Sequence, residues 1–413
     1  ALFREQEFSV LVLLQVFALL LLFAAFFSAL LLCLTSFARS FKEAQAYLIP
    51  LMLASLTPGV MGMLPGLELK GLLTVIPLVN IVLMARDLFE KGVEPAVAAT
   101  VVLTTLFYAL AALALAARVF GAENVLYSEQ SGWADLFRRP EMPQSATSLP
   151  MALWCLALMV PLHFALTALA GALTGLSLST RVLLSIPINL LLFGCFPAVF
   201  LYLGRVDVMP GLGLSAPNGK RLGVGLIAGA ILGASLWPLE LAALAQSGIT
   251  AEIQERFADQ LQKLHQVQQQ LGWSILSIVI VPAILEEFFF RGMLYEALAR
   301  RLTPLATVGM TGLLFGLAHV ILDGALGLER LAPSTFLGLV LSAVRWRTGT
   351  IWPAVVLHVL HNTILLIIGI AEPGSTPEIK GTWIAGGVTG ALVGVALLWC
   401  FGRSNAPEPR VAD

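Results

Sequence analysis

The sequence predicts an all-α protein, a polytopic membrane helical bundle. The chain has 413 residues, of which 58% are hydrophobic and only 12% are charged, whereas soluble domains carry about 25% charged residues. Apolar runs of the roughly 20 residues that a helix needs to cross a bilayer recur along the chain. These runs are rich in Leu and Ala and lack period-2 alternation, which favours helices over a closed barrel.

The apolar runs predict about eleven or twelve membrane segments in two modules. The run at 71–85 is short for a crossing, so it is expected to be re-entrant or tilted. Lys/Arg pairs fall on both sides of a simple alternation, so the positive-inside rule gives no orientation. The expected segments are 8–34, 45–65, 71–85 and 95–117, followed by 150–174, 182–204, 222–246, 272–297, 303–322, 332–346, 350–371 and 382–401.

The longest polar connection predicts the domain boundary. Residues 121–149 are rich in charges and prolines and separate a membrane module at 1–120 from a second one at 150–403. Residues 250–270 have apolar side chains at helical spacing among charges and glutamines, which is typical of an amphipathic helix on the membrane surface or of a solvated connector. The polar tail at 404–413 is expected to be disordered.

Charge and cysteine content restrict the partners. The net charge of −1 gives no indication of nucleic acid, and the expected partners are membrane lipids and a peptide or protein substrate. Each of the four cysteines lies inside an apolar run without paired spacing, so all are expected to be buried small hydrophobic residues. They are Cys33, Cys155, Cys195 and Cys400. The chain begins with Ala and a polar stub, and we expect it to start inside a longer gene product.

Two adjacent carboxylates end an apolar run. Glu287 and Arg291 are four residues apart, so they share a helix face and can form an ion pair. Glu286 lies about 100° further round the helix. A buried carboxylate without that cation is suited to act as a general base. The alternative is a pair of interfacial glutamates at a helix end.

Two further apolar segments carry histidines. His319 follows Phe315 by four residues among small residues that permit close helix packing. His358 and Asn362 are also four residues apart, and both residue types can donate hydrogen bonds to a developing oxyanion. His361 is close enough to reach the same site. Taken singly, each histidine has a structural alternative, namely a satisfied packing or interfacial residue.

Together these residues predict water attack on a carbonyl group. Glu286 and His319 would activate the water, and His358 and Asn362 would hold the oxyanion. Ionisable groups at membrane depth are rare and by default mark function. The alternative is a zinc site made of Glu286, His319 and His358. Because the sequence has no His-Glu-x-x-His pair, a mechanism without metal or other cofactor is favoured.

The motifs Glu286-Glu287-x-x-x-Arg291, Phe315-x-x-x-His319 and His358-x-x-x-Asn362 resemble the CPBP family, the CAAX proteases and bacteriocin-processing enzymes. The resemblance covers about 150–403. It implies a helical bundle with a membrane-embedded cavity and an intramembrane glutamic endopeptidase. Under it, Glu286 and His319 activate water, His358 and Asn362 form the oxyanion site, and Glu287 and Arg291 are supporting residues. The expected location is a bacterial inner membrane.

Residues 36–45, Pro58-Gly59 and Pro77-Leu78-Val79-Asn80 resemble the later helices of ABC-2 type transporter permeases of the sodium-exporting kind. That resemblance implies a truncated permease-like module fused to the protease and a separate ATPase subunit, because the chain has no phosphate-binding loop of its own. The alternative function is therefore a permease component of an ABC exporter whose C-terminal bundle is structural or regulatory. The alternative interpretation of residues 1–120 is a generic helical anchor.

Overall fold

The computed structural model describes residues 10–38, 40–120, 139–215, 219–246, 271–322, 328–371 and 380–400. Within these ranges the chain is helical, and its only β pairing is a bridge between Gln144 and Val206. The all-α prediction is therefore confirmed. The predictions for 250–270 and for 404–413 fall outside the described residues, as does most of the connection at 121–149.

The described residues contain nine helices long and apolar enough to cross a membrane, and a shorter apolar helix at Trp352–Ile368. The chain is therefore an integral membrane protein. Three expected segments, 71–85, 332–346 and 350–371, are not among the nine, and the last of them corresponds to the shorter helix. The first is divided by a break, and the second belongs to a helix with two arginines in its last turn.

The described chain divides into two compact units. Unit 1 comprises residues up to Arg138 together with Leu153–Ala168, and unit 2 comprises Arg139–Ala152 and residues from Leu169 onward. One helix, α6 (Leu149–Ala172), contributes to both.

Besides its part of α6, the described part of unit 1 has three long helices and a broken segment. These are α1 (Val10–Thr35), α2 (Phe41–Met63), η1 (Gly71–Thr74), α3 (Val79–Glu90) and α4 (Pro95–Phe120). The break lies at Leu78, whose φ of 68° is left-handed. Asn80 in the first turn of α3 donates hydrogen bonds to Thr74 O and Thr105 Oγ1. The first bond satisfies a backbone carbonyl next to the break, and the second connects α3 to α4.

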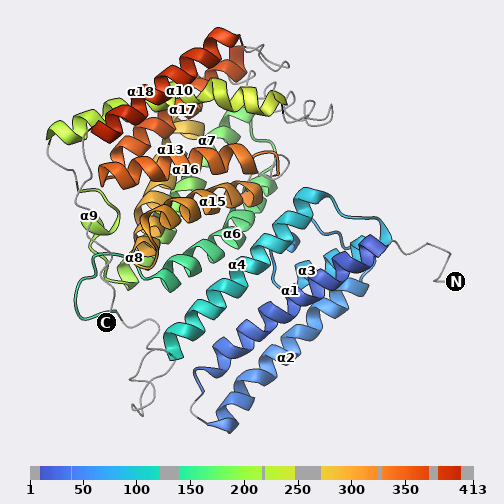
Figure 1. Ribbon diagram of the computed structural model, residues 1–413. Coiled ribbons are helices and arrows are strands. Elements are labelled where there is room, and N and C mark those ends of the chain that lie inside the picture. Colours follow the sequence, from blue (N-terminus) through green and yellow to red (C-terminus); the bar gives the residue numbers. More distant parts are fainter. Residues whose placement is uncertain are drawn as a thin grey trace. The chain divides into compact units, whose positions relative to one another are not determined.

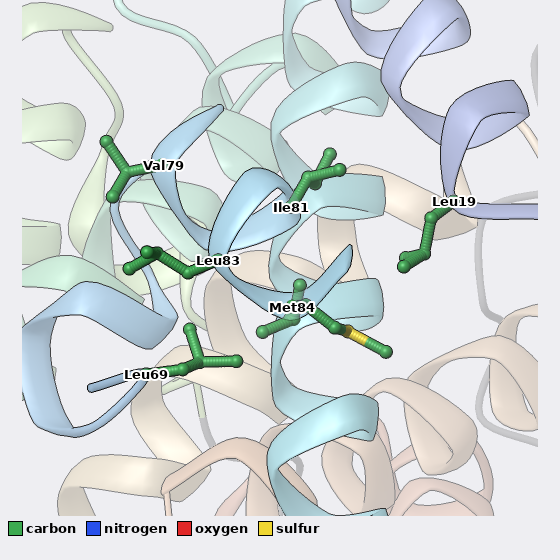
Figure 2. Close-up of a cluster of buried hydrophobic side chains, with 7 residues drawn as sticks. Leu19, Leu69, Val79, Ile81, Leu83 and Met84 are labelled. Atoms are coloured by element: carbon green, nitrogen blue, oxygen red, sulfur yellow. The ribbon is translucent and has the colours of Figure 1, made fainter. Parts of the chain in front are cut away.

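An apolar cluster holds the broken segment in place. Figure 2 shows Leu83 and Met84 of α3, Leu69 of the preceding loop and Leu19 of α1 among its members. The expectation that 71–85 is not a straight crossing agrees with this arrangement.

Unit 2 carries the remaining helices (Figure 1). In chain order these are α7 (Leu178–Asn189), η3 (Leu190–Cys195), α8 (Phe196–Leu203), α9 (Val208–Gly211), α10 (Gly219–Gln246), α12 (Leu271–Ser274), η5 (Ile275–Ile280), α13 (Val281–Glu287), η6 (Phe288–Leu294), α14 (Tyr295–Ala299), α15 (Pro304–Leu322), α16 (Leu331–Thr348), α17 (Trp352–Ala371) and α18 (Gly381–Cys400).

Three of these elements are π-helical: η3, η5 and η6. Pro197 follows η3 and Pro282 follows η5, each at the start of the next α-helical stretch. A proline inside an α-helix lacks an N–H and clashes with the carbonyl four residues earlier. A widened π turn accommodates both effects without ending the helix, and such turns are frequent at functional sites.

Glycines set the packing of α10 between α17 and α18, which run beside it in Figure 1. A Cβ atom on Gly233 would lie 2.6 Å from the carbonyl oxygen of Leu357 in α17. On α18, a Cβ on Gly387 would lie 2.8 Å from the carbonyl oxygen of Ser235. Small residues permit such close contact between helices in a membrane, where apolar burial alone does not drive association.

Cys33 and Cys155 are buried as expected, but Cys195 is exposed on η3, so the prediction was wrong for this residue. A thiol inside a membrane-spanning helix is compatible with lipid, so an apolar run does not force it toward the protein interior.

The loops that connect the helices at one end of the unit 2 bundle, here called the first edge, form hydrogen bonds to one another. Gln144 N–H donates to Arg205 O, Arg300 donates to Ser145 Oγ, and Ile351 N–H donates to Gly213 O. The exposed cations at this edge are Arg139, Arg205, Lys220, Arg221, Arg300 and Arg301. Among the described residues, the exposed cations at the opposite ends of the helices are Arg181, Arg330 and Lys380.

We expect the first edge to face the cytoplasm, because Lys and Arg are enriched in cytoplasmic connections. A single cysteine replacing Arg301 in a cysteine-free protein should react with an impermeant maleimide only in inverted vesicles. A cysteine replacing Lys380 should react only in intact cells. The reverse labelling pattern would contradict this orientation.

Candidate active site

Three helical segments of unit 2 carry the six predicted site residues. Glu286 and Glu287 end α13, and Arg291 lies in η6 directly after them. His319 lies in the last turn of α15, and α17 carries His358 and Asn362. The segments pack together because α13 contacts α17, and η6 contacts both α15 and α16.

One oxygen of Glu287 joins two of these segments. Glu287 Oε1 accepts a hydrogen bond from Arg291 Nη1 at 2.8 Å, which is the ion pair expected from their spacing. The same atom lies 2.9 Å from His358 Nδ1. Glu287 and Arg291 are fully buried, and His358 is 2% exposed. This buried group therefore connects α13, η6 and α17.

Phe315 is the apolar centre of the site. Its ring lies 4.3 Å from the guanidinium carbon of Arg291 and 4.4 Å from the ring of His319, between centroids. The ring of His358 is 5.8 Å away. The aromatic face stabilises the cation and excludes water from its hydrogen bonds.

Small residues bring α15 and α16 together around Phe315. A Cβ atom on Gly312 would lie 2.8 Å from the backbone nitrogen of Leu339, and one on Gly338 would lie 3.1 Å from the Phe315 ring. The close packing that the small residues around His319 predicted is present. It also brings Gly338 O within 3.1 Å of Arg291 Nη2.

Hydrogen bonds define the tautomers of both histidines. His319 Nδ1 lies 2.8 Å from the carbonyl oxygen of Phe315, and a carbonyl only accepts, so Nδ1 carries the proton. His358 Nδ1 faces the Glu287 carboxylate in the same way. In the neutral form each histidine then presents the lone pair of Nε2. Asp323, which follows His319 by four residues in the sequence, lies outside the described residues.

Both Nε2 atoms face Glu286. Glu286 Oε2 lies 4.0 Å from His319 Nε2 and 4.0 Å from His358 Nε2. The side chains of Glu286 and His319 are 14% and 15% exposed, unlike the buried Glu287–Arg291 pair. The site therefore has a buried support and a more accessible face formed by Glu286 and His319.

His361 faces away from this group. His361 Nε2 lies 2.7 Å from Glu240 Oε2 of α10, and the histidine is 1% exposed. Asn362 is partly buried one turn beyond His358. Sequence reasoning missed Glu240, although a lone carboxylate within the apolar run 222–246 is a signal for a specific role.

The distances from Glu286 Oε2 to the two histidine Nε2 atoms can be compared with those between the ligand atoms of a zinc site. Tetrahedral zinc sites have bonds of about 2.0–2.2 Å, which place ligand atoms about 3.3 Å apart. The 4.0 Å separations around Glu286 are longer. Among the described residues, no group of three or more His, Cys, Asp or Glu side chains is placed to hold a metal ion.

Residues 268–364 match a family model described as Type II CAAX prenyl endopeptidase Rce1-like. This stretch contains all six predicted site residues and does not extend into residues 1–120. No curated protein and no solved structure matches the chain. The chain is therefore an integral membrane protein whose residues 268–364 are similar to the Rce1-like CAAX endopeptidases, a family of membrane proteases.

Proposed function

We propose that the chain is an intramembrane endopeptidase that hydrolyses a peptide bond with a water molecule activated by Glu286 and His319. The observation that carries the proposal is the position of Glu286 Oε2, 4.0 Å from the Nε2 atoms of His319 and His358. A water with hydrogen bonds of about 2.8 Å can bridge atoms at that separation. It would donate to Glu286 and to one histidine lone pair.

The proposed reaction begins with transfer of a proton from that water to Glu286. The water oxygen forms a bond to the peptide carbonyl carbon, and the carbonyl π electrons move to the carbonyl oxygen. The oxyanion electrons then re-form the C=O bond as the C–N bond breaks, and Glu286 passes the proton to the departing amide nitrogen. The products are a carboxylic acid and an amine, so no external oxidant, reductant or covalent enzyme intermediate is required.

His358 and Asn362 are the proposed donors to the oxyanion. The Asn362 amide donates without any change of protonation. Because His358 Nδ1 already faces Glu287, His358 donates from Nε2 only when both ring nitrogens are protonated. Glu287 Oε1 holds the His358 ring by its contact with Nδ1, and orienting His358 is the role that we propose for the buried pair with Arg291.

The substrate class follows from the matched family description, which names prenyl endopeptidases. A prenylated C-terminal peptide is therefore the first substrate to test, and we propose a bacterial inner membrane as the location. The family match does not extend into residues 1–120, so the permease-like module and its separate ATPase subunit stay predictions.

The variant Glu286→Gln should lower the rate of peptide cleavage by about 10²–10⁴-fold, because the amide has nearly the same size but cannot accept the proton. The assay compares one peptide with and without a farnesyl group, using protein in proteoliposomes. Glu141→Gln, a carboxylate in an exposed connection, is the control and should cleave normally. Normal cleavage by Glu286→Gln would exclude Glu286 as the base. Mass spectrometry of peptides retained by this variant would identify natural substrates.

Zinc removal should leave cleavage unchanged if the site works without metal. The purified protein is treated with 1,10-phenanthroline and its zinc content is measured alongside the rate of cleavage. Loss of activity that added zinc restores, with about one zinc bound per chain, would favour the His₂Glu alternative instead.

Arg291→Met should lower the free energy of unfolding by about 3–5 kcal/mol, because it leaves the buried Glu287 carboxylate without its cation. Thermal unfolding in detergent measures the effect. Arg301→Met removes an exposed cation and should change stability by less than about 0.5 kcal/mol. Equal stability of the two variants would show that Arg291 does not compensate the buried charge.

A further inference from the structure

Arg345 of α16 donates a hydrogen bond to the backbone of the candidate active site. Its Nε atom lies 3.2 Å from the carbonyl oxygen of Arg291 in η6. In an α-helix that carbonyl would accept from the Tyr295 N–H, four residues later. Here the Tyr295 N–H bonds to Phe290 O and Gly292 O instead. The π turn therefore directs the Tyr295 N–H away from the Arg291 carbonyl. Arg345 Nε donates a hydrogen bond to that carbonyl.

The connection between η6 and α16 is reciprocal. In turn, Arg291 Nη2 donates a hydrogen bond to the carbonyl oxygen of Gly338 in α16 at 3.1 Å. Each segment therefore contributes one arginine that binds a backbone carbonyl of the other. Two such bonds restrict the rotation of η6 as well as its distance from α16.

Arg345 is itself held in one position. Its side chain is 6% exposed, and Nη2 donates to Glu296 Oε1 of α14. Its guanidinium carbon lies 5.3 Å from the Tyr295 ring. Gly213 covers the guanidinium at a left-handed φ of 62°, and a Cβ atom there would lie 2.6 Å from the guanidinium carbon. These contacts leave little freedom for another rotamer.

We propose that Arg345 is a positioning residue for peptide hydrolysis. By holding the π turn, it keeps Arg291 paired with Glu287 at 2.8 Å. Glu287 in turn holds His358 at 2.9 Å, which directs Nε2 toward Glu286. Arg345 therefore acts on the reacting groups through Arg291 and Glu287. This inference rests on the proposed function, since the step that it supports is the proposed cleavage.

The test compares Arg345→Lys with Arg347→Lys. Lysine keeps the charge but lacks the fork that bonds Arg291 O and Glu296 together. Arg347 lies on the same helix but donates to the carbonyls of Leu398 and Trp399 in α18, so it controls for the loss of an arginine from α16.

We expect Arg345→Lys to lower kcat by about 10–100-fold, as the loss of supporting contacts does at other sites, with KM changed by less than about threefold. The pH profile of kcat should also move, because His358 loses its fixed partner geometry. Arg347→Lys should keep kcat within about twofold of the wild type. Equal kcat values and pH profiles for the two variants would overturn the proposal.

A second variant and a second measurement keep the test decisive. Glu296→Gln weakens the ion pair that holds Arg345 but keeps the arginine, so it should also lower kcat. This variant replaces Arg345→Lys in the test if Arg345→Lys does not fold. A double-mutant cycle of Arg345→Lys and His358→Gln on the thermal unfolding temperature should show non-additive effects. That measurement needs no substrate. Additivity would refute the inference, whereas full activity of Glu286→Gln would refute the proposed function.

Discussion

The site depends on one buried atom, Glu287 Oε1, which binds both Arg291 and His358. Taking a carboxylate out of water costs several kcal/mol, and only well-placed partners offset that cost. Arg291 supplies the opposite charge from the same helical stretch, and Phe315 covers the guanidinium. The carboxylate in turn determines which nitrogen of His358 carries the proton. The chemistry proposed at Glu286 therefore rests on a support that solvent does not reach.

The helix that carries this atom departs from α geometry on both sides of it. The π turn η5 precedes Pro282, and η6 carries Arg291. In lipid, a backbone carbonyl that leaves the helical pattern needs another donor within the protein. The arginine side chain of α16 bonds to the Arg291 carbonyl. The membrane thus makes an irregular helix dependent on a specific partner, which explains why a charged residue is found buried there.

Glycine positions bring the helices of the site into register. Gly312 and Gly338 bring α15 against α16, so that Phe315 and the Gly338 carbonyl reach Arg291. Gly233 brings α10 against α17, and Glu240 of α10 pairs with His361 one turn from His358. Two carboxylates from different helices therefore hold α17 on two sides. Larger residues at these glycines would separate the helices and lengthen the hydrogen bonds that orient the histidines.

The sequence by itself determined the all-α membrane class and the Glu287–Arg291 pair, because hydropathy and helical spacing are local properties. It also indicated that 71–85 is too short for an ordinary crossing, but only the structure located the break at Leu78. Through three motifs it also singled out Glu286, Glu287, Arg291, His319 and His358, which lie close together in the structure. It singled out Asn362 as well, whose role stays a prediction. It did not predict that Glu287 binds His358, that Arg345 binds the η6 backbone, or that one edge of unit 2 carries most of the exposed cations among the described residues. It also misplaced Cys195. The Glu287–His358 contact joins residues 71 positions apart. Residue spacing predicts neighbours within about one helical turn, whereas contacts over longer separations are decided by how the helices pack.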